Sequence, residues 1–105
     1  MQQLVLEAQA DLGVLSKAVR RAIGERIRDL DATLRLLQQS LREYELRHNM
    51  LSDRFYQKYL SGDELPDTNE FQMWAGEYEM YQELTKERDL LAGVQVCPSK
   101  NTSGN

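Results

Sequence analysis

A run of apolar residues at helical spacing constrains the fold of this chain more than any other feature. Successive members are separated by alternating steps of four and three residues, which makes a heptad seam over three repeats and predicts one long amphipathic helix. Because such a seam has to be covered, we expect it to form a homodimeric coiled coil or a hairpin bundle. The alternative is a helix that packs on the chain's own downstream helices. The candidate dimer-seam residues are Ile23, Ile27, Leu30, Leu34, Leu37, Leu41 and Tyr44.

The residues before the seam continue the helical pattern. Apolar side chains recur at steps of three or four from Leu4 to Val19, so we expect the first helix to cover residues 1–48. Gly13 lies inside this stretch, and a glycine in a helix costs up to about 1 kcal/mol relative to Ala. The sequence therefore leaves open whether the helix is broken there. Asn49 is expected to end the helix, since Asn tolerates the left-handed conformation.

Residues 55–84 hold the only Trp, both Phe and four of the five Tyr of the chain. Just before them, Ser52 offers a side-chain oxygen that can cap a short helix over residues 53–60. Gly62 can end that helix by adopting a positive φ. A loop follows, and its one apolar residue, Leu65, is expected to fill the corner between this helix and the next.

A second long helix is predicted after the loop. Asp67 is expected to cap its start, with Glu70 completing a capping-box arrangement, and Gly93 is expected to end it. Residues 94–105 lose all periodicity and are rich in Ser, Asn, Gly and Pro, which predicts a disordered tail. Residues 52–93 are thus expected to form a helix-loop-helix docking region with an aromatic and acidic surface.

The apolar face of the second long helix is wider than a two-residue seam. We therefore expect it to contact two surfaces, one on its own chain and one on a partner. Trp, Tyr and Met are enriched in protein interfaces, although an aromatic stripe at helical spacing is also typical of a core. The candidate partner-binding residues are Phe55, Tyr56, Tyr59, Leu65, Phe71, Trp74, Tyr78 and Tyr81.

The charge of the chain is unevenly distributed. The net charge is −4, and residues 51–105 carry five Lys or Arg against ten Asp or Glu. This acidic half disfavours nucleic acid as a partner, because phosphate contacts need cations, and it suits a basic protein better. A single cysteine, Cys97, cannot form an intramolecular disulfide, which fits the reducing cytosol. No apolar run approaches the roughly 18 residues of a membrane span, so we expect a cytoplasmic chain with no membrane contact.

No set of residues has the types and spacing of a catalytic or metal site. The acidic residues between Asp63 and Glu70 lack the alternating ligands of a calcium loop. Glu77 and Glu79 point to different faces of a helix, and His48 has no partner at metal-site spacing. We therefore expect no enzymatic activity, no cofactor and no metal.

A pattern of aromatic, glycine and acidic residues runs through residues 41–84, of the kind M-S-x-x-x-F-Y…G-E-L-x-D…F-x-x-W-A-x-x-Y-x-M-Y. In this chain an extra residue, Asp63, stands between the glycine and the Glu-Leu pair. The pattern falls on Met50, Phe55, Tyr56, Gly62, Glu64, Leu65, Asp67, Phe71, Trp74, Ala75, Tyr78, Met80 and Tyr81. This pattern resembles that of small helical prokaryotic proteins, the antitoxin-type partners encoded beside small toxins in toxin–antitoxin operons. The resemblance implies stoichiometric binding of a cognate toxin from the adjacent gene, which occludes the toxin's active surface without catalysis.

Together these features predict an all-α chain in which a long helix, a short helix and a second long helix form a dimerising helical hairpin. The expected function is that of an antitoxin, and the alternative is a structural coiled-coil adaptor or assembly subunit. The sequence leaves open the partner's identity and activity, the orientation of paired helices, and whether operator DNA is bound.

Overall fold

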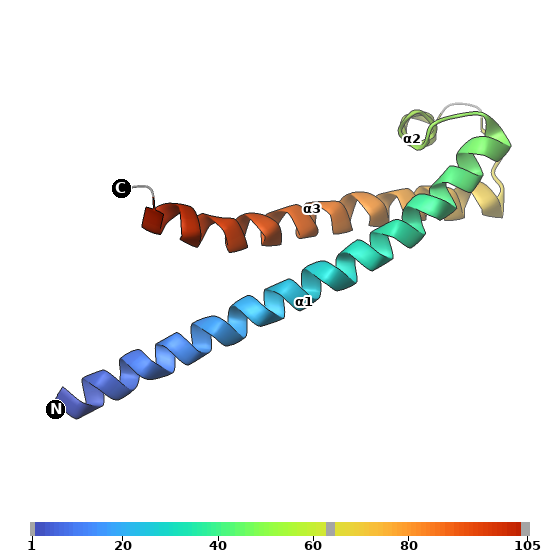
Figure 1. The fold of residues 1–105 in the computed structure, drawn as a ribbon. Coiled ribbons are helices and arrows are strands. Elements are labelled where there is room, and N and C mark those ends of the chain that lie inside the picture. The colour runs from blue at the N-terminus through green and yellow to red at the C-terminus, as the bar shows by residue number, and fades with distance from the viewer. Residues whose placement is uncertain (1, 63–64, 104–105) are drawn as a thin grey trace.

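Three helices make up the part of the chain that this computed structural model describes, which is residues 2–62 and 65–103. Side chains are described for residues 11–62 and 65–94. In chain order the helices are α1 (Gln2–His48), α2 (Ser52–Ser61) and α3 (Asn69–Ser103). The predicted all-α order of a long, a short and a long helix is confirmed. In Figure 1, α1 and α3 run in opposite directions as a hairpin, and α2 lies beside its closed end.

The length of α1 determines the shape of the molecule. At 1.5 Å per residue its 47 residues span about 70 Å, and the longest dimension of the molecule is 71 Å. The radius of gyration is 21.2 Å, against about 13 Å for a compact chain of this length. Gly13 does not break α1, and a Cβ added there would meet nothing within 4 Å.

The hairpin has a closed end and an open end, because α1 and α3 diverge away from the loop (Figure 1). Two ion pairs connect the helices where they begin to separate. Arg26 donates two hydrogen bonds to Glu87, at 2.7 and 3.1 Å, and Arg88 donates one to Asp31 at 2.9 Å. The hydrogen bonds from Arg26 lower the pKa of Glu87. On the open side of these pairs, residues 11–22 of α1 are all exposed.

The heptad seam of α1 is covered mainly by its own chain. Its last five members, from Leu30 to Tyr44, are buried within a single chain, whereas Ile23 and Ile27 are half-buried. Of the two arrangements that the sequence allowed, packing on the chain's own downstream helices describes the seam from Leu30 onward. A second copy of the chain is not needed to cover that part.

Two helix ends have the conformations that the sequence predicts. Asn49 follows α1 with a φ of 51°, in the left-handed region. Gly62 follows α2 with a φ of 74°, and its N–H donates to the carbonyl of Lys58. These two turns reverse the chain direction around α2 and bring it back to the start of α3.

The predicted cap of α2 is wrong. Ser52 is the first residue inside the helix, and Leu51, in the N-cap position, makes no side-chain cap hydrogen bond. Ser52 is buried, and its hydroxyl accepts a hydrogen bond from Trp74. The reason is that the buried indole N–H needs an acceptor, whereas the first backbone N–H of the helix is accepted by the Glu45 carboxylate from α1.

The predicted cap of α3 is displaced by one residue. Thr68 Oγ1 accepts the backbone N–H of Phe71 at 3.2 Å, whereas Asp67 accepts a hydrogen bond from the side chain of Gln72. Glu70 does not complete a capping box, because its carboxylate is paired with side chains of α1. Tertiary ion pairs therefore replaced the local arrangement expected from the sequence.

Gly93 does not end α3, whose bounds reach Ser103. The disordered tail expected over residues 94–105 stays a prediction. A single glycine costs only about 1 kcal/mol in a helix, so it ends one only where another conformation competes. Residues 104 and 105 and the side chain of Cys97 lie outside the described part of the chain.

Candidate functional site

The closed end of the hairpin contains one hydrophobic core to which all three helices contribute. Its buried members are Leu41 and Tyr44 of α1, Phe55 of α2, and Trp74 and Ala75 of α3. Partly buried side chains pack around them, namely Met50, Tyr56, Leu65, Phe71, Tyr78 and Tyr81. Leu65, in the loop between α2 and α3, is one of the residues that pack against this core.

Trp74 lies at the centre of this core. Its ring stacks on Phe55 with a centroid distance of 3.8 Å and an interplanar angle of 3°. On other sides it meets Tyr44 at 5.5 Å and His48 at 5.4 Å, both nearly parallel to it. Aromatic pairs at such separations stabilise a fold beyond the area that they bury. Trp74 therefore holds α2 and the end of α1 against α3.

Ser52 connects the three helices through two hydrogen bonds. Its hydroxyl accepts from Trp74 Nε1 at 3.0 Å, and its backbone N–H donates to Glu45 Oε2 at 2.9 Å. The sequence offered no signal for this role, because a serine before a helix is read as a cap.

A second set of hydrogen bonds between α1 and α3 has the Glu77 carboxylate as its acceptor. The Tyr44 hydroxyl donates to Glu77 Oε2 at 2.8 Å, and the Ser40 hydroxyl donates to Glu77 Oε1. Burial raises the pKa of Tyr44, and the hydrogen bond to Glu77 raises it further. With two hydroxyls donating to it, this carboxylate has the geometry of a structural acceptor.

Glu70 joins the first turn of α3 to the last turn of α1. Its carboxylate pairs with Arg47 and lies 2.9 Å from His48 Nε2. The His48 ring also contacts Phe71 edge-on, with centroids 4.9 Å apart. His48 is therefore part of the packing at the closed end.

The predicted partner-binding residues lie mostly in this core. Phe55 and Trp74 are fully buried, and Tyr59 is exposed on α2. The remaining five, Tyr56, Leu65, Phe71, Tyr78 and Tyr81, are partly buried against the core. Most of these residues thus form a folding core, and a partner can reach Tyr59 and the outer edges of the half-buried members.

The dimer-seam candidates divide between the two ends of the molecule. Leu41 and Tyr44 belong to the closed-end core, and the buried Leu30, Leu34 and Leu37 continue it toward the open end. Ile23 and Ile27 lie where α1 and α3 separate. Only these last two are still partly accessible to another chain.

A groove of about 460 Å³ opens at the closed end, with walls from all three helices. Its lining residues are Gln38, Leu41, Arg42, Glu45, Leu51, Ser52, Asp53, Tyr78 and Tyr81. Burial raises the pKa of Tyr78, and the charge of Asp53 raises it further. Two carboxylates and one guanidinium give this groove a mixed, slightly acidic lining.

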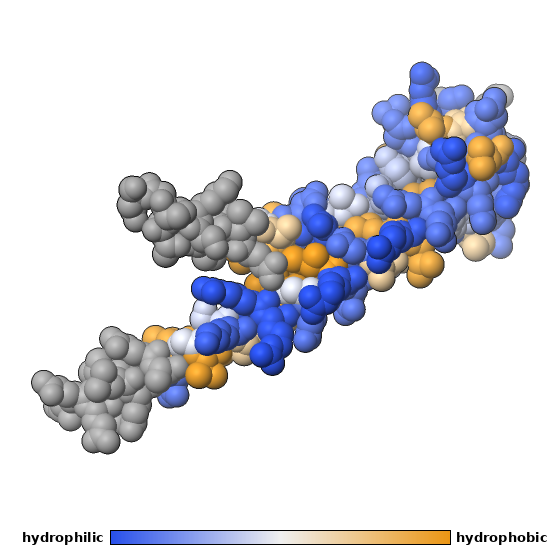
Figure 2. Space-filling model, in the orientation of Figure 1, coloured by the Kyte–Doolittle hydropathy of each residue, from blue (hydrophilic) through white to orange (hydrophobic). Residues whose placement is uncertain are grey.

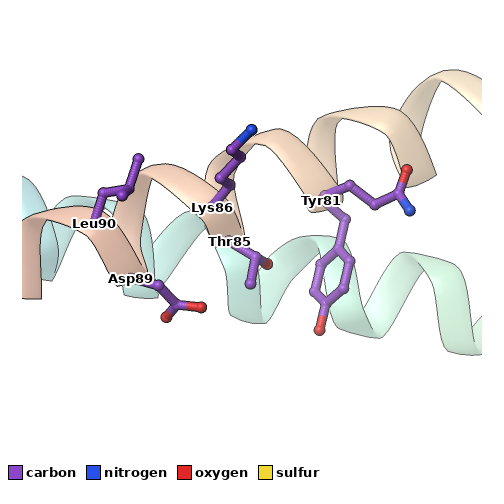
Figure 3. Close-up of a pocket in the computed structure, with 6 residues that line it drawn as sticks. Tyr81, Thr85, Lys86, Asp89 and Leu90 are labelled. Atoms are coloured by element: carbon purple, nitrogen blue, oxygen red, sulfur yellow. The ribbon is translucent and has the colours of Figure 1, made fainter. Parts of the chain in front are cut away.

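A shallower groove follows α3 from Tyr81 to Leu90. Figure 3 shows Tyr81 extending from α3 toward α1, and its hydroxyl accepts a hydrogen bond from Gln38 at 3.4 Å. The Thr85 hydroxyl oxygen is buried there without a hydrogen-bond partner among the described residues.

In the described part of the chain, no group of three or more His, Cys, Asp or Glu is placed to hold a metal ion. Within the same residues, neither long helix contains a stretch apolar enough to span a bilayer. Comparison with protein-family models, with curated proteins and with solved structures gave no match to this chain.

Proposed function

We propose that this chain is a non-enzymatic, cytoplasmic antitoxin-type protein that binds a cognate toxin through the closed end of its hairpin. The observation that carries the proposal is the position of Met80. Most of the residues that carry the resemblance to the antitoxin-type family lie in the closed-end core, so folding alone accounts for their residue types. Among the pattern residues with described side chains, Met80 is the exposed large apolar one, with 48% of its surface accessible.

Packing within the chain does not account for Met80, whereas a contact with a partner would account for it. Met73 lies seven residues earlier, two helical turns away on the same face of α3, and is also exposed. Methionine is enriched in interfaces, and its flexible thioether adapts to irregular surfaces. Met73 and Met80 together form an apolar stripe, called here the methionine stripe, that suits the surface of another protein.

The charge around the methionine stripe favours a basic partner. Glu70 and Glu87 of α3 are paired with Arg47 and Arg26 of α1, but Glu79 and Glu83, one and three residues from Met80, are exposed. Complementary potentials accelerate association and fix the register of two surfaces. A small toxin with a basic surface, as expected for one that acts on nucleic acid, would match this helix.

The alternative role as a coiled-coil adaptor receives less support. In that role the whole seam from Ile23 to Tyr44 serves assembly with other chains. Five of its seven residues are instead buried within one chain. A helix can present a seam to a partner only where its own chain leaves the seam uncovered.

The proposal is tested by growth of cells that express the product of the neighbouring gene, alone and together with this chain. We expect the neighbour to arrest growth and wild-type chain to restore it. Met80→Lys should abolish the rescue, because it places a cation where a basic partner docks, whereas Leu36→Lys should not. Leu36 is an exposed apolar residue of α1 outside the resemblance pattern, which makes it a matched control.

Circular dichroism of both variants separates lost binding from lost folding, since both substitutions lie on exposed helix faces. A harmless neighbouring gene product, or full rescue by a folded Met80→Lys variant, would contradict the proposal.

A further inference from the structure

Four arginines follow one another along α1 at steps of seven residues. They are Arg21, Arg28, Arg35 and Arg42, called here the arginine row, and all four are exposed. Seven residues make almost two full turns of a helix, so these side chains leave the same face of α1 at intervals of about 10.5 Å. The row therefore extends over about 32 Å.

The arginine row lies on the opposite side of α1 from the packed face. Leu30 and Leu37 stand two residues after Arg28 and Arg35, and both leucines are buried. Because two residues turn a helix by about 200°, each buried leucine and the arginine before it point to nearly opposite sides. Figure 2 shows mostly hydrophilic side chains along the middle of α1 and apolar ones between α1 and α3. The row thus faces away from the core of the hairpin.

The positive charge of the row is not neutralised by the chain itself. None of the four arginines forms an ion pair with a described side chain. Three acidic residues lie three or four positions from a member of the row, on the same side of α1. Asp31 pairs with Arg88, Glu45 accepts the backbone N–H of Ser52, and the third is Glu25. Four guanidinium groups against one further carboxylate give this face a surplus of positive charge.

We propose that the arginine row binds the phosphate backbone of a DNA duplex. A duplex carries one negative charge per about 1.7 Å of its axis, so a straight row of cations about 32 Å long lies beside many phosphates at once. The arginine guanidinium forms two parallel hydrogen bonds with a phosphate, which suits it to this contact better than a lysine. Such contacts fix the position of a protein on the duplex and do not read the base sequence.

The composition of this face favours phosphates over an acidic protein. A protein interface needs an apolar, well-packed centre, and exposed ion pairs alone contribute little to binding. The exposed apolar residues of the face, Val14 and Leu46, lie beyond the two ends of the row. An anionic membrane surface would need an apolar face beside the cations, and that face of α1 is buried within the chain from Leu30 onward. The residues between the arginines on the same face are small or polar, namely Ala18, Gly24, Ala32, Gln38 and Gln39.

Two further features favour a DNA duplex over other nucleic acids. Single strands are held by aromatic side chains on which their bases stack, whereas residues 1–43 contain no aromatic residue. Residues 11–22, which include the start of the row, are all exposed and belong to a helix about 10–12 Å across. The major groove of B-DNA, about 12 Å wide, admits such a helix, whereas the major groove of an RNA duplex is deep and narrow.

This site goes beyond the proposed antitoxin function, because it uses the outer face of α1 and leaves the methionine stripe of α3 free. The surplus of acidic residues that disfavours nucleic acid lies in residues 51–105, outside α1. The same chain can therefore bind DNA with α1 and a basic protein with α3.

Fluorescence anisotropy tests the proposal with the full purified chain, no toxin, and a labelled DNA duplex of arbitrary sequence. We expect a dissociation constant of about 10⁻⁶ to 10⁻⁴ M. The logarithm of the association constant should fall with the logarithm of the salt concentration at a slope of about −3 to −4, as for four phosphate contacts. Arg28→Gln together with Arg35→Gln should weaken binding about tenfold or more and make that slope shallower by about two.

The matched control is Arg54→Gln together with Lys58→Gln. Both residues are exposed on α2, a different helix, and the two double variants change the net charge by the same amount. We expect the control to bind DNA as the wild-type chain does. Circular dichroism should show both double variants fully helical, since all four substituted side chains are exposed.

The proposal is overturned if the wild-type chain does not bind the DNA duplex. It is also overturned if the two double variants lose affinity equally, because net charge alone would then account for the binding. Equal or tighter binding of an RNA duplex of the same length, or of polyglutamate at the same charge concentration, would assign the row to RNA or to acidic proteins and so contradict it.

Discussion

The indole N–H of Trp74 donates a hydrogen bond to the buried hydroxyl of Ser52 at 3.0 Å. Ser52→Ala should leave that N–H unpaired inside the core, which costs about 1–3 kcal/mol of the free energy of unfolding. Urea denaturation followed by the fluorescence of the single Trp measures this cost directly.

Ser61→Ala is the control for that substitution. Ser61 is exposed at the other end of α2, and its hydroxyl donates to the carbonyl of Lys58. Surface changes of this kind usually alter stability by less than about 0.5 kcal/mol. Equal losses in the free energy of unfolding of the two serine variants would show that the hydrogen bond to Trp74 stabilises the fold no more than a surface hydrogen bond does.

Alkaline pH should destabilise the fold through its buried tyrosines. Burial raises the pKa of Tyr44 and of Tyr78 above the ordinary value of 10.0, so their neutral forms are favoured in the folded state. Below pH 10.0 these tyrosines contribute their full share to the free energy of unfolding. Above it the unfolded chain releases protons that the folded chain retains, so the free energy of unfolding falls until pH passes the folded-state pKa values.

Parallel titrations of tyrosinate absorbance and helicity test this expectation. Helicity should be lost as the late-titrating tyrosines ionise, and Tyr44→Phe should make the fall in stability with pH less steep. If all five tyrosines titrate near pH 10 while the helices stay intact, the expectation fails.

Two glycines should respond in opposite directions to substitution by alanine. Gly62 has a φ of 74°, a conformation in which a Cβ is strained, so Gly62→Ala should destabilise the chain by about 1 kcal/mol. Gly76 lies inside α3, where a Cβ would meet nothing within 4 Å, so Gly76→Ala should stabilise it by roughly 0.5–1 kcal/mol.

Thermal unfolding of the two alanine variants gives the sign of each effect. A stabilised Gly62→Ala variant would mean that the turn after α2 does not need its left-handed residue.

Local signals in the sequence were sufficient to predict the order of the three helices. The steps of four and three from Ile23 to Tyr44 specify a helix face whatever covers it, and Asn49 and Gly62 mark turns through their own backbone preferences. The aromatic residues of the closed-end core were instead assigned to a partner surface, because helical spacing does not distinguish a core from an interface.

The remaining features depend on neighbours distant in the sequence. Ser52 and Glu70 have short side chains with local capping options, yet each is held by a residue 22 positions away, on a different helix. The seam pattern is the same whether α3 or a second chain covers it, so spacing alone could not decide its partner. Met80 could not be separated from the core residues around it until the packing showed that they are covered while Met80 is exposed.

The central claim is that Met80 and the closed end bind a toxin, and titration calorimetry tests it most directly. The purified full chain is titrated with the purified product of its neighbouring gene. We predict saturable binding that Met80→Ala weakens by roughly tenfold or more, as for a central interface residue, and that Leu36→Ala leaves unchanged. Absence of binding, or equal affinity of the wild-type and Met80→Ala chains, would contradict the account.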